Sequence, residues 1–323
     1  MTDRKTLIRE FLAGSKWENW TQSPLAGDAS SRRYLRLTSS ETTAILMDAD
    51  PATGQSTTTF ANIGDWLTRQ GLCAPKTLLH DPANGLLLLE DLGSVDFAMH
   101  LANAPNETEL LYTAATDILV QIDRTKPLAG LSRMTPEVGG DMLDITTEWY
   151  GDSSQKQIID EVKNHLERFC PTADKLSLRD FHAENMIWRP NLNGTDRVGL
   201  LDYQDAFIAP PGYDLISMLR DVRRVVDPQI AHNMTAHFIS KTGADPDTTP
   251  AALACLAVQR NLRILGVFAR LAVRDRKTRY MSMIPHIWAM IDADLRHPAL
   301  KSLQKCVQQT LPPPHKSQIK DLL

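Results

Sequence analysis

The sequence has few of the features that mark disulfide-rich, metal-binding or membrane proteins. Its four cysteines, at positions 73, 170, 255 and 306, lie far apart and form no Cys-x-x-Cys pair. This spacing excludes the common zinc motifs and favours reduced thiols. The N-terminus has no apolar segment of signal-peptide length, and no later run reaches the roughly 20 consecutive apolar residues of a membrane span. We therefore expect a cytoplasmic protein that does not act at a membrane.

The sequence also has no excess of positive charge, with 35 Lys and Arg against 39 Asp and Glu. The net charge of -4 gives no sequence-wide basic field, so nucleic acid is not expected as a partner. No lysine lies between Lys16 and Lys76. The share of apolar residues, 42%, and of charged residues, 23%, is ordinary for a globular protein, and 323 residues suffice for two lobes with separate cores. No feature indicates an obligate protein partner.

The order of local patterns predicts a sheet followed by helices. Short strand-like segments lie at 33–37, 43–47, 76–80 and 85–90, with a helical face at 59–69 between them. After Asp91 helical periodicity dominates, interrupted by short apolar segments at 175–178, 186–188 and 198–201. We expect one lobe over residues 1–91 and a second over 92–323.

The most informative pattern is Asp180-Phe-His-Ala-Glu-Asn185, followed by Asp202 at the end of an apolar strand. Phosphoryl transfer needs a carboxylate to take the acceptor hydroxyl's proton and hard oxygen ligands for magnesium. Asp180 suits the base, and Asn185 and Asp202 suit the metal. The pattern predicts a small-molecule kinase that uses ATP and Mg²⁺. The other interpretation is that all three residues are turn or cap residues.

Two neighbouring residues have more than one interpretation. Asp180 and His182 have the spacing of metal ligands, but no second histidine cluster supports them, so His182 is better interpreted as structural or substrate-facing. Asp214 opens a predicted helix after Gly212. It either favours the helix N-terminus or accepts backbone N–H groups of the loop that carries Asp180.

These motifs resemble the superfamily of aminoglycoside phosphotransferases and choline kinases. Within it, residues 24–34, 47–51, 88–93, 200–206 and 259–266 are similar to the bacterial anomeric N-acetylmuramate/N-acetylglucosamine kinases. The resemblance implies an α+β, two-lobed protein-kinase-like fold, with a small N-terminal antiparallel sheet lobe that binds nucleotide and a larger, mostly helical C-terminal lobe for catalysis and substrate. It also implies ATP-dependent phosphorylation of an amino sugar's anomeric hydroxyl in peptidoglycan recycling.

The resemblance further implies the nucleotide contacts. A loop over the phosphates would include Leu25, Gly27, Asp28, Ser30, Arg32 and Arg33, and a hinge beside adenine would run from Glu90 to Leu92. The sequence differs from the superfamily's pattern in two places. Leu178 stands where a histidine is usual, and the strand lysine that binds the phosphates is missing. We expect Arg32 or Arg33 to replace that lysine, the alternative being a solvated strand edge.

For the amino-sugar acceptor, the sequence offers candidate residues but no motif. They are His182, Gln204, Asp205, Glu148 and Trp149. Trp149 is the more readily interpreted as a core residue. Arg260 and Arg263 would approach a lactyl carboxylate, although arginines that bury only their stems at a surface are commoner.

Two other functions stay open. Acidic residues at 141, 144, 148 and 152 would suit a kinase of aminoglycosides, choline or another amino alcohol. Leu178 and the missing lysine would suit a nucleotide-binding pseudokinase, although such a protein has no need to keep Asp180, Asn185 and Asp202 together.

Overall fold

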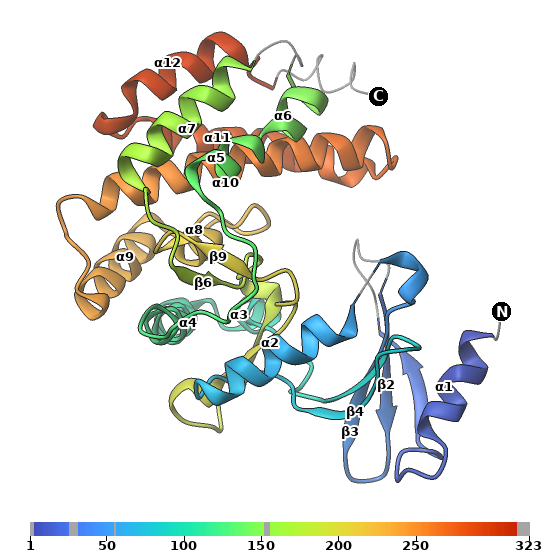
Figure 1. Ribbon diagram of the computed structural model, residues 1–323. Helices are drawn as coiled ribbons and strands as arrows, with labels where there is room; N and C mark the ends of the chain where they lie inside the picture. Colours follow the sequence, from blue (N-terminus) through green and yellow to red (C-terminus); the bar gives the residue numbers. More distant parts are fainter. Residues whose placement is uncertain (1–2, 26–31, 55, 152–155, 315–323) are drawn as a thin grey trace. The chain divides into compact units, whose positions relative to one another are not determined.

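The computed structural model describes residues 3–25, 32–54, 56–151 and 156–314 (Figure 1). Its contacts divide the chain into two units, which we treat separately. The first contains Met1–Pro105 and Glu184–Gln204, and the second contains Asn106–Ala183 and Asp205–Leu323. The segment that carries Asn185 and Asp202 thus groups with the N-terminal sheet. The lobe boundary at residue 91 stays a prediction.

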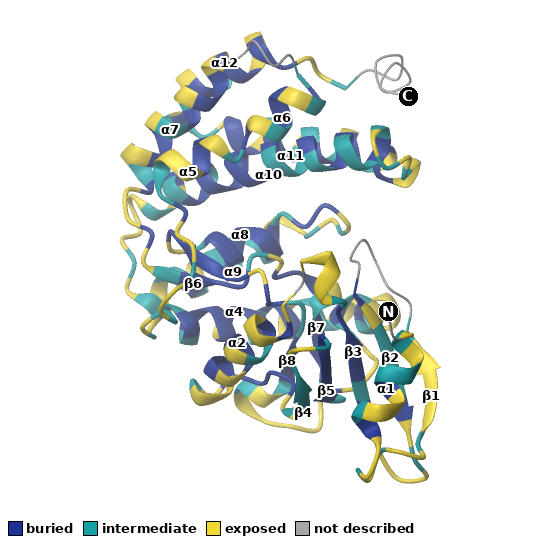
Figure 2. Ribbon diagram, turned by 45° about the vertical axis from the view of Figure 1, so that its right-hand side comes forward, coloured by how far each residue is buried: buried dark blue, intermediate teal, exposed yellow. Residues whose placement is uncertain are grey.

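The first unit is built on a five-stranded antiparallel sheet with the strand order β1-β2-β3-β5-β4. The strands are β1 (Thr21–Pro24), β2 (Arg33–Thr38), β3 (Thr43–Asp48), β4 (Thr77–Asp81) and β5 (Leu86–Glu90). Four of them lie where the sequence predicts strands. Figure 2 shows that β3 and β5 are largely buried, as expected for apolar central strands.

Three α-helices and a ribbon complete the described part of this unit. The helices are α1 (Arg4–Leu12), α2 (Thr57–Arg69) and α3 (Phe97–Asn103), and the ribbon pairs β7 (Met186–Trp188) with β8 (Val198–Leu200). Backbone hydrogen bonds join the ribbon to the N-terminal part, because Leu200 N–H donates to the Cys73 carbonyl at 2.7 Å and Trp188 N–H to the Val95 carbonyl at 2.9 Å. Gly64 of α2 lies so close to Tyr203 that an added Cβ would be 2.5 Å from its hydroxyl oxygen.

The second unit is mostly helical. Its helices are α4 (Thr108–Asp123), α5 (Pro136–Asp141), α6 (Asp144–Trp149), α7 (Gln157–Phe169), α8 (Tyr213–Leu219), α9 (Pro228–Thr242), α10 (Thr249–Val273), α11 (Ile284–Leu295) and α12 (Lys301–Thr310). A second ribbon pairs β6 (Lys175–Ser177) with β9 (Phe207–Ala209). The order of sheet first and helices afterwards is therefore confirmed, and this ribbon leads directly into the loop that carries Asp180.

Helix α10 forms the centre of this unit's core. Its buried residues, among them Leu256, Leu262 and Leu265, pack with apolar side chains of α7, α11 and α12. By length and mean composition α10 would be able to cross a membrane, although Gln259, Arg260 and Asn261 interrupt its apolar residues. However, 72% of that apolar window is buried inside the protein, which is the environment of a core helix.

Candidate active site

Asp214 organises the loop that precedes Asp180. Its carboxylate is 5% exposed at the start of α8. It accepts hydrogen bonds from the Ser177 hydroxyl at 2.6 Å, from Leu178 N–H at 2.6 Å and from Arg179 N–H at 3.0 Å. Burial raises the pKa of Asp214 to about 6, against the lowering effect of these bonds. The predicted contact with the backbone of the Asp180 loop is thus present.

Arg179 is fixed in an unusual conformation immediately before Asp180. Its φ of 74° lies in the left-handed region, which disfavours a residue with a Cβ. Its N–H is held by Asp214 and Ser177, and its carbonyl accepts a hydrogen bond from the Ser217 hydroxyl at 3.2 Å. Ser217 in turn accepts one from Arg260 Nη2 at 2.8 Å. Asp180 is exposed at the end of this braced segment.

The β7–β8 ribbon brings Asn185 and Asp202 to one end of the first unit. Met186 pairs with Leu200, and Leu201 N–H donates to the Asn185 carbonyl at 3.0 Å, so the two candidate metal ligands follow from the strand register. Asp202 also has a left-handed φ, 55°. Its side chain is 44% exposed and accepts a hydrogen bond from Gln204 Nε2 at 2.9 Å.

A carboxylate and an amide oxygen suit a hard divalent cation that keeps several waters or phosphate oxygens as its other ligands. Within the described residues, no group of three or more His, Cys, Asp and Glu side chains could hold a metal ion. The metal interpretation of His182 therefore gains no support. A site made from Asn185 and Asp202 would be completed by the substrate's oxygens.

The structure distinguishes the three arginines near the predicted phosphate loop. Arg32 is 9% exposed, and its Nη1 lies 3.9 Å from Asp202 Oδ1. Arg33 is 66% exposed and pairs with Asp48 at 3.0 Å, while Arg36 pairs with Asp91 at 2.8 Å. Of the three, Arg32 is the one beside the candidate metal ligand.

The other predicted nucleotide contacts are described only in part. Leu25 N–H donates to the Tyr34 carbonyl at 2.9 Å, which joins the two sides of the loop at its base. Gly27, Asp28 and Ser30 lie outside the described residues. In the hinge, Glu90 N–H donates to the Lys76 carbonyl at 2.9 Å, and Leu92 is buried. Their nucleotide contacts stay predictions.

The candidate acceptor residues have very different environments. His182 is buried, and burial together with Arg223 and Arg260 lowers its pKa to about 3, so its imidazole is neutral. Gln204 is buried in the first unit, whereas Asp205 is exposed in the second.

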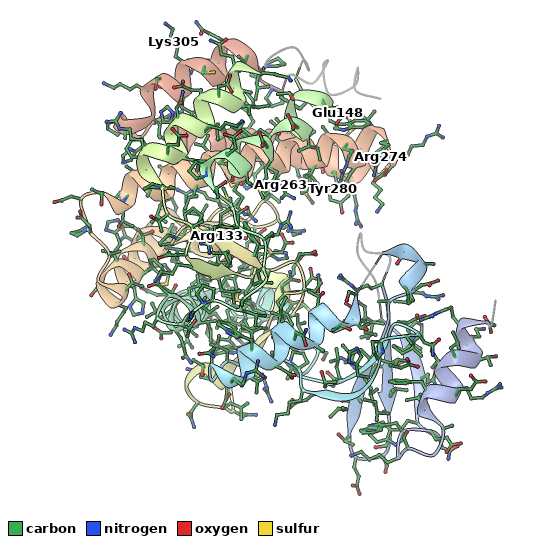
Figure 3. The ribbon with its side chains drawn as sticks, viewed as in Figure 1. Arg133, Glu148, Arg263, Arg274, Tyr280 and Lys305 are labelled. Atoms are coloured by element: carbon green, nitrogen blue, oxygen red, sulfur yellow. The ribbon has the colours of Figure 1, made fainter. Side chains whose placement is uncertain are left out.

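The remaining acceptor candidates come from α6 and α10. Glu148, labelled in Figure 3, is exposed on α6. Trp149 packs against the core of the second unit, which favours its interpretation as a core residue. Arg260 is 5% exposed, so the interpretation as a surface arginine is wrong for it. Its guanidinium, and not only its stem, is buried.

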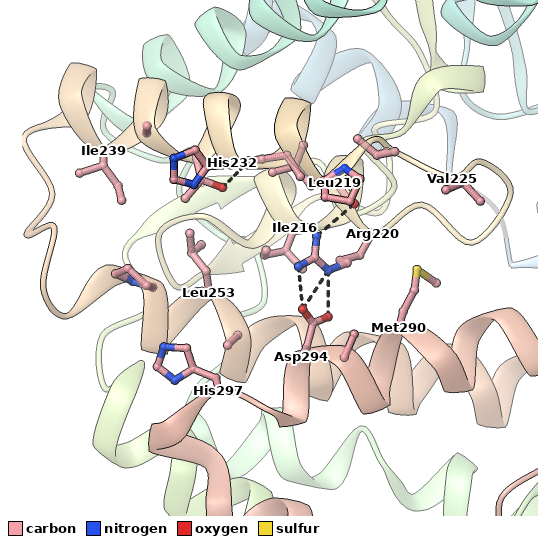
Figure 4. A pocket seen from close by; sticks show the side chains of 18 of the residues that line it. Ile216, Leu219, Arg220, Val225, His232, Ile239, Leu253, Met290, Asp294 and His297 are labelled. Atoms are coloured by element: carbon pink, nitrogen blue, oxygen red, sulfur yellow. Dashed lines mark hydrogen bonds and ion pairs between the residues drawn. The ribbon is translucent and has the colours of Figure 1, made fainter.

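A separate cavity of about 1250 Å³ lies between α8, α9, α10 and α11 (Figure 4). Its walls are largely apolar, and Arg220 forms an ion pair with Asp294 at 2.7 Å among its lining residues. None of the candidate site residues named above lines this cavity. It is therefore distinct from the candidate active site.

Residues 21–252 match the model of the phosphotransferase enzyme family, which covers more than half of the chain. The chain belongs to this family. It is 31% identical to the N-acetylmuramate/N-acetylglucosamine kinase of Caulobacter vibrioides, over 96% of this chain and 98% of the relative. It is 27% identical to the protein of the same name from Pseudomonas aeruginosa, over 87% and 86% of the two chains.

Solved structures of this phosphotransferase's fold include other small-molecule kinases. An amicoumacin kinase in complex with AMP-PNP, Ca²⁺ and its ligand has a TM-score of 0.67 and 16% identity, covering 92% of this chain and 95% of that one. The choline kinase of Streptococcus pneumoniae has a TM-score of 0.64 and 14% identity, covering 90% and 99%. These likenesses confirm the predicted protein-kinase-like α+β fold.

Proposed function

We propose that this phosphotransferase uses ATP to phosphorylate the anomeric hydroxyl of N-acetylmuramate and N-acetylglucosamine, in the salvage of peptidoglycan sugars. The observation that carries the proposal is the likeness to the Caulobacter vibrioides kinase. It extends over 96% of this chain and 98% of the relative, and so includes the helical second unit as well as the sheet. The acceptor is a small molecule, and the use of ATP fits a cytoplasmic enzyme.

Asp180 is the proposed base. Its exposed carboxylate would accept the proton of the anomeric hydroxyl as the oxygen attacks the γ-phosphoryl group. Asp214, Ser177 and Ser217 hold the preceding Arg179 through its N–H and its carbonyl. Such fixation is useful because phosphoryl transfer depends mainly on positioning and on charge stabilisation.

Asn185 and Asp202 are the proposed ligands of Mg²⁺. They would hold an ion whose charge stabilises the negative charge that develops on the phosphate oxygens. Arg32 is the proposed replacement for the missing lysine, because its buried guanidinium lies 3.9 Å from Asp202. Arg33 is a weaker candidate, since it is two-thirds exposed and already pairs with Asp48.

The charges around the Asp180 loop support a neutral or anionic acceptor. Burial raises the pKa of Tyr213, next to Asp214, and the charges of Arg260, Arg263 and Arg179 act against this rise, whereas Asp180 adds to it. A cationic aminoglycoside or choline would meet repulsion from these arginines. The rival kinase functions are therefore less well supported.

The pseudokinase interpretation also loses support at Leu178. This side chain is 3% exposed, and its backbone N–H makes the hydrogen bond to Asp214. Because the backbone makes that contact, replacing a histidine side chain at this position leaves it available.

The test is turnover of magnesium-ATP with N-acetylmuramate, N-acetylglucosamine, choline and an aminoglycoside, with the product phosphate located by phosphorus NMR. We expect anomeric phosphate on the two sugars, and its near-complete loss in Asp180→Asn with ATP still bound. Phosphorylation of choline or the aminoglycoside in place of the sugars would refute the proposal. ATP binding with no transfer to any acceptor would support the pseudokinase.

A further inference from the structure

Helix α10 carries two arginines, Arg260 and Arg263, that lie three residues apart and therefore on neighbouring positions of one helical face. Arg260 is committed to contacts inside the protein. It is 5% exposed, and it donates to Ser217 Oγ at 2.8 Å and to Asn261 Oδ1 at 3.4 Å. Its charge also favours the ionised forms of the buried Asp214 and Asp221.

Arg263 has a different environment. Its side chain is partly exposed, and no residue in the described part of the chain forms a hydrogen bond or ion pair with its guanidinium. Figure 3 labels it on the side of α10 that faces the β6–β9 ribbon. Burial lowers the pKa of Arg263, and the charges of Arg179 and Arg260 lower it further. Tyr213 and Asp180 act in the opposite direction. A cation that is partly desolvated and has no fixed counter-ion is suited to binding an anion.

We propose that Arg263 binds the carboxylate of an acidic sugar acceptor and thereby favours N-acetylmuramate over N-acetylglucosamine. The inference rests on the proposed function. N-acetylmuramate carries a lactyl carboxylate on C3 of the ring whose C1 hydroxyl would face Asp180, whereas N-acetylglucosamine has an uncharged hydroxyl at C3. Arg263 lies three residues from Arg260, which bonds to Ser217 and through it to the carbonyl of Arg179, the residue before Asp180. A guanidinium at this position would detect the one group in which these sugars differ, through a bidentate, charge-assisted contact.

The first experiment compares kcat and KM for both sugars in the native enzyme, Arg263→Gln and Arg263→Lys. Loss of a hydrogen-bonded charge contact predicts that Arg263→Gln lowers kcat/KM for N-acetylmuramate roughly 10- to 100-fold, mainly through KM. Turnover of N-acetylglucosamine should stay within about threefold, which also shows that the variant is folded. Arg263→Lys should retain part of the preference for N-acetylmuramate, because lysine keeps the positive charge but cannot make the bidentate contact.

The matched control is Arg274→Gln, which removes an exposed arginine that follows the same helix and pairs with its neighbour Asp275. It should leave the kinetics of both sugars unchanged. A second test needs no variant: the methyl ester of N-acetylmuramate, which lacks the negative charge, should lose the same factor with the native enzyme. It should lose nothing more with Arg263→Gln.

Several outcomes would overturn the inference while leaving the proposed function intact. An equal loss for both sugars in Arg263→Gln, or no loss for either, would mean that Arg263 does not recognise the carboxylate. Turnover of the ester equal to that of the acid would lead to the same conclusion. If the native enzyme phosphorylates neither sugar, the proposed function itself fails, which is a separate result.

Discussion

Replacing Asp214 with Asn should displace the Asp180 loop while leaving the stability of the fold nearly unchanged. Two donors, Ser177 Oγ and Arg179 N–H, bond to Asp214 Oδ1, and a third, Leu178 N–H, bonds to Oδ2. An Asn in the same place can keep its oxygen toward the first two. Its NH₂ group then faces Leu178 N–H, so that a donor opposes a donor.

The size of the effect follows from two opposing contributions. Loss of a hydrogen bond to a charged group costs about 1.5–3 kcal/mol, and an unsatisfied buried donor costs about 1–3 kcal/mol. Against this, burial raises the pKa of Asp214 from 3.8 to about 6. A rise of this size means that keeping the charge at neutral pH costs the folded state about 3 kcal/mol. Asn removes that cost, so global stability should change little.

The loop receives no such compensation. If misplacement of the Asp180 carboxylate raises the activation free energy by about 3 kcal/mol, kcat falls roughly 100-fold. We expect KM for ATP to stay within about threefold and the midpoint of thermal unfolding to shift by only a few degrees. Asp294→Asn is the matched control, because it removes another buried carboxylate of the second unit, one that pairs with Arg220 away from the loop. A folded Asp214→Asn enzyme with near-native kcat would refute the reasoning.

Three further predictions concern both units. Arg32→Ala should raise KM for ATP or lower kcat by roughly 10- to 100-fold through loss of a charge contact, whereas Arg33→Ala should have little effect in the same steady-state assay. Gly64→Ala should lower the free energy of unfolding of the first unit by about 1–3 kcal/mol, since the new Cβ would be 2.5 Å from the Tyr203 hydroxyl; denaturant titration should show partial recovery with Tyr203→Phe. The pKa of Asp214 rises from 3.8 to about 6, so between these pH values the folded state binds more protons than the unfolded state. The native enzyme should therefore lose stability relative to Asp214→Asn as the pH rises from 4 to 6, and equal pH slopes in denaturant titrations would contradict this.

Most elements of the fold follow from local sequence patterns, and the exceptions have physical reasons. The strand β1 has the polar sequence Thr-Gln-Ser-Pro, all of it exposed, and only backbone pairing with β2 makes it a strand. The strand β9 is three residues long and is defined by its pairing with β6. Neither strand can be predicted from a short segment of sequence, because each depends on a pairing strand elsewhere in the chain.

The sequence predicts the candidate site residues and one residue that supports them, Asp214, but not the other supporting residues. The spacing of Asp180, Asn185 and Asp202 is a readable pattern, whereas Ser177 and Ser217 belong to no motif and gain their roles only from Asp214 and Arg179. The preference for Arg32 over Arg33 also needs the structure. Arg33 pairs in register with Asp48 on β3, while Arg32 precedes the strand and lies beside Asp202.

Two residues of the candidate site, Arg179 and Asp202, have a left-handed backbone conformation. Within the described chain, three residues other than glycine have a positive φ, and two of them are Arg179 and Asp202. Each such conformation costs about 1–3 kcal/mol unless the surroundings fix it. Arg179 is fixed by hydrogen bonds within the second unit, and Asp202 contacts Arg32 and Gln204 within the first. The residue that precedes the proposed base is therefore held within the second unit, and the proposed metal ligand Asp202 is held within the first, before any substrate contributes.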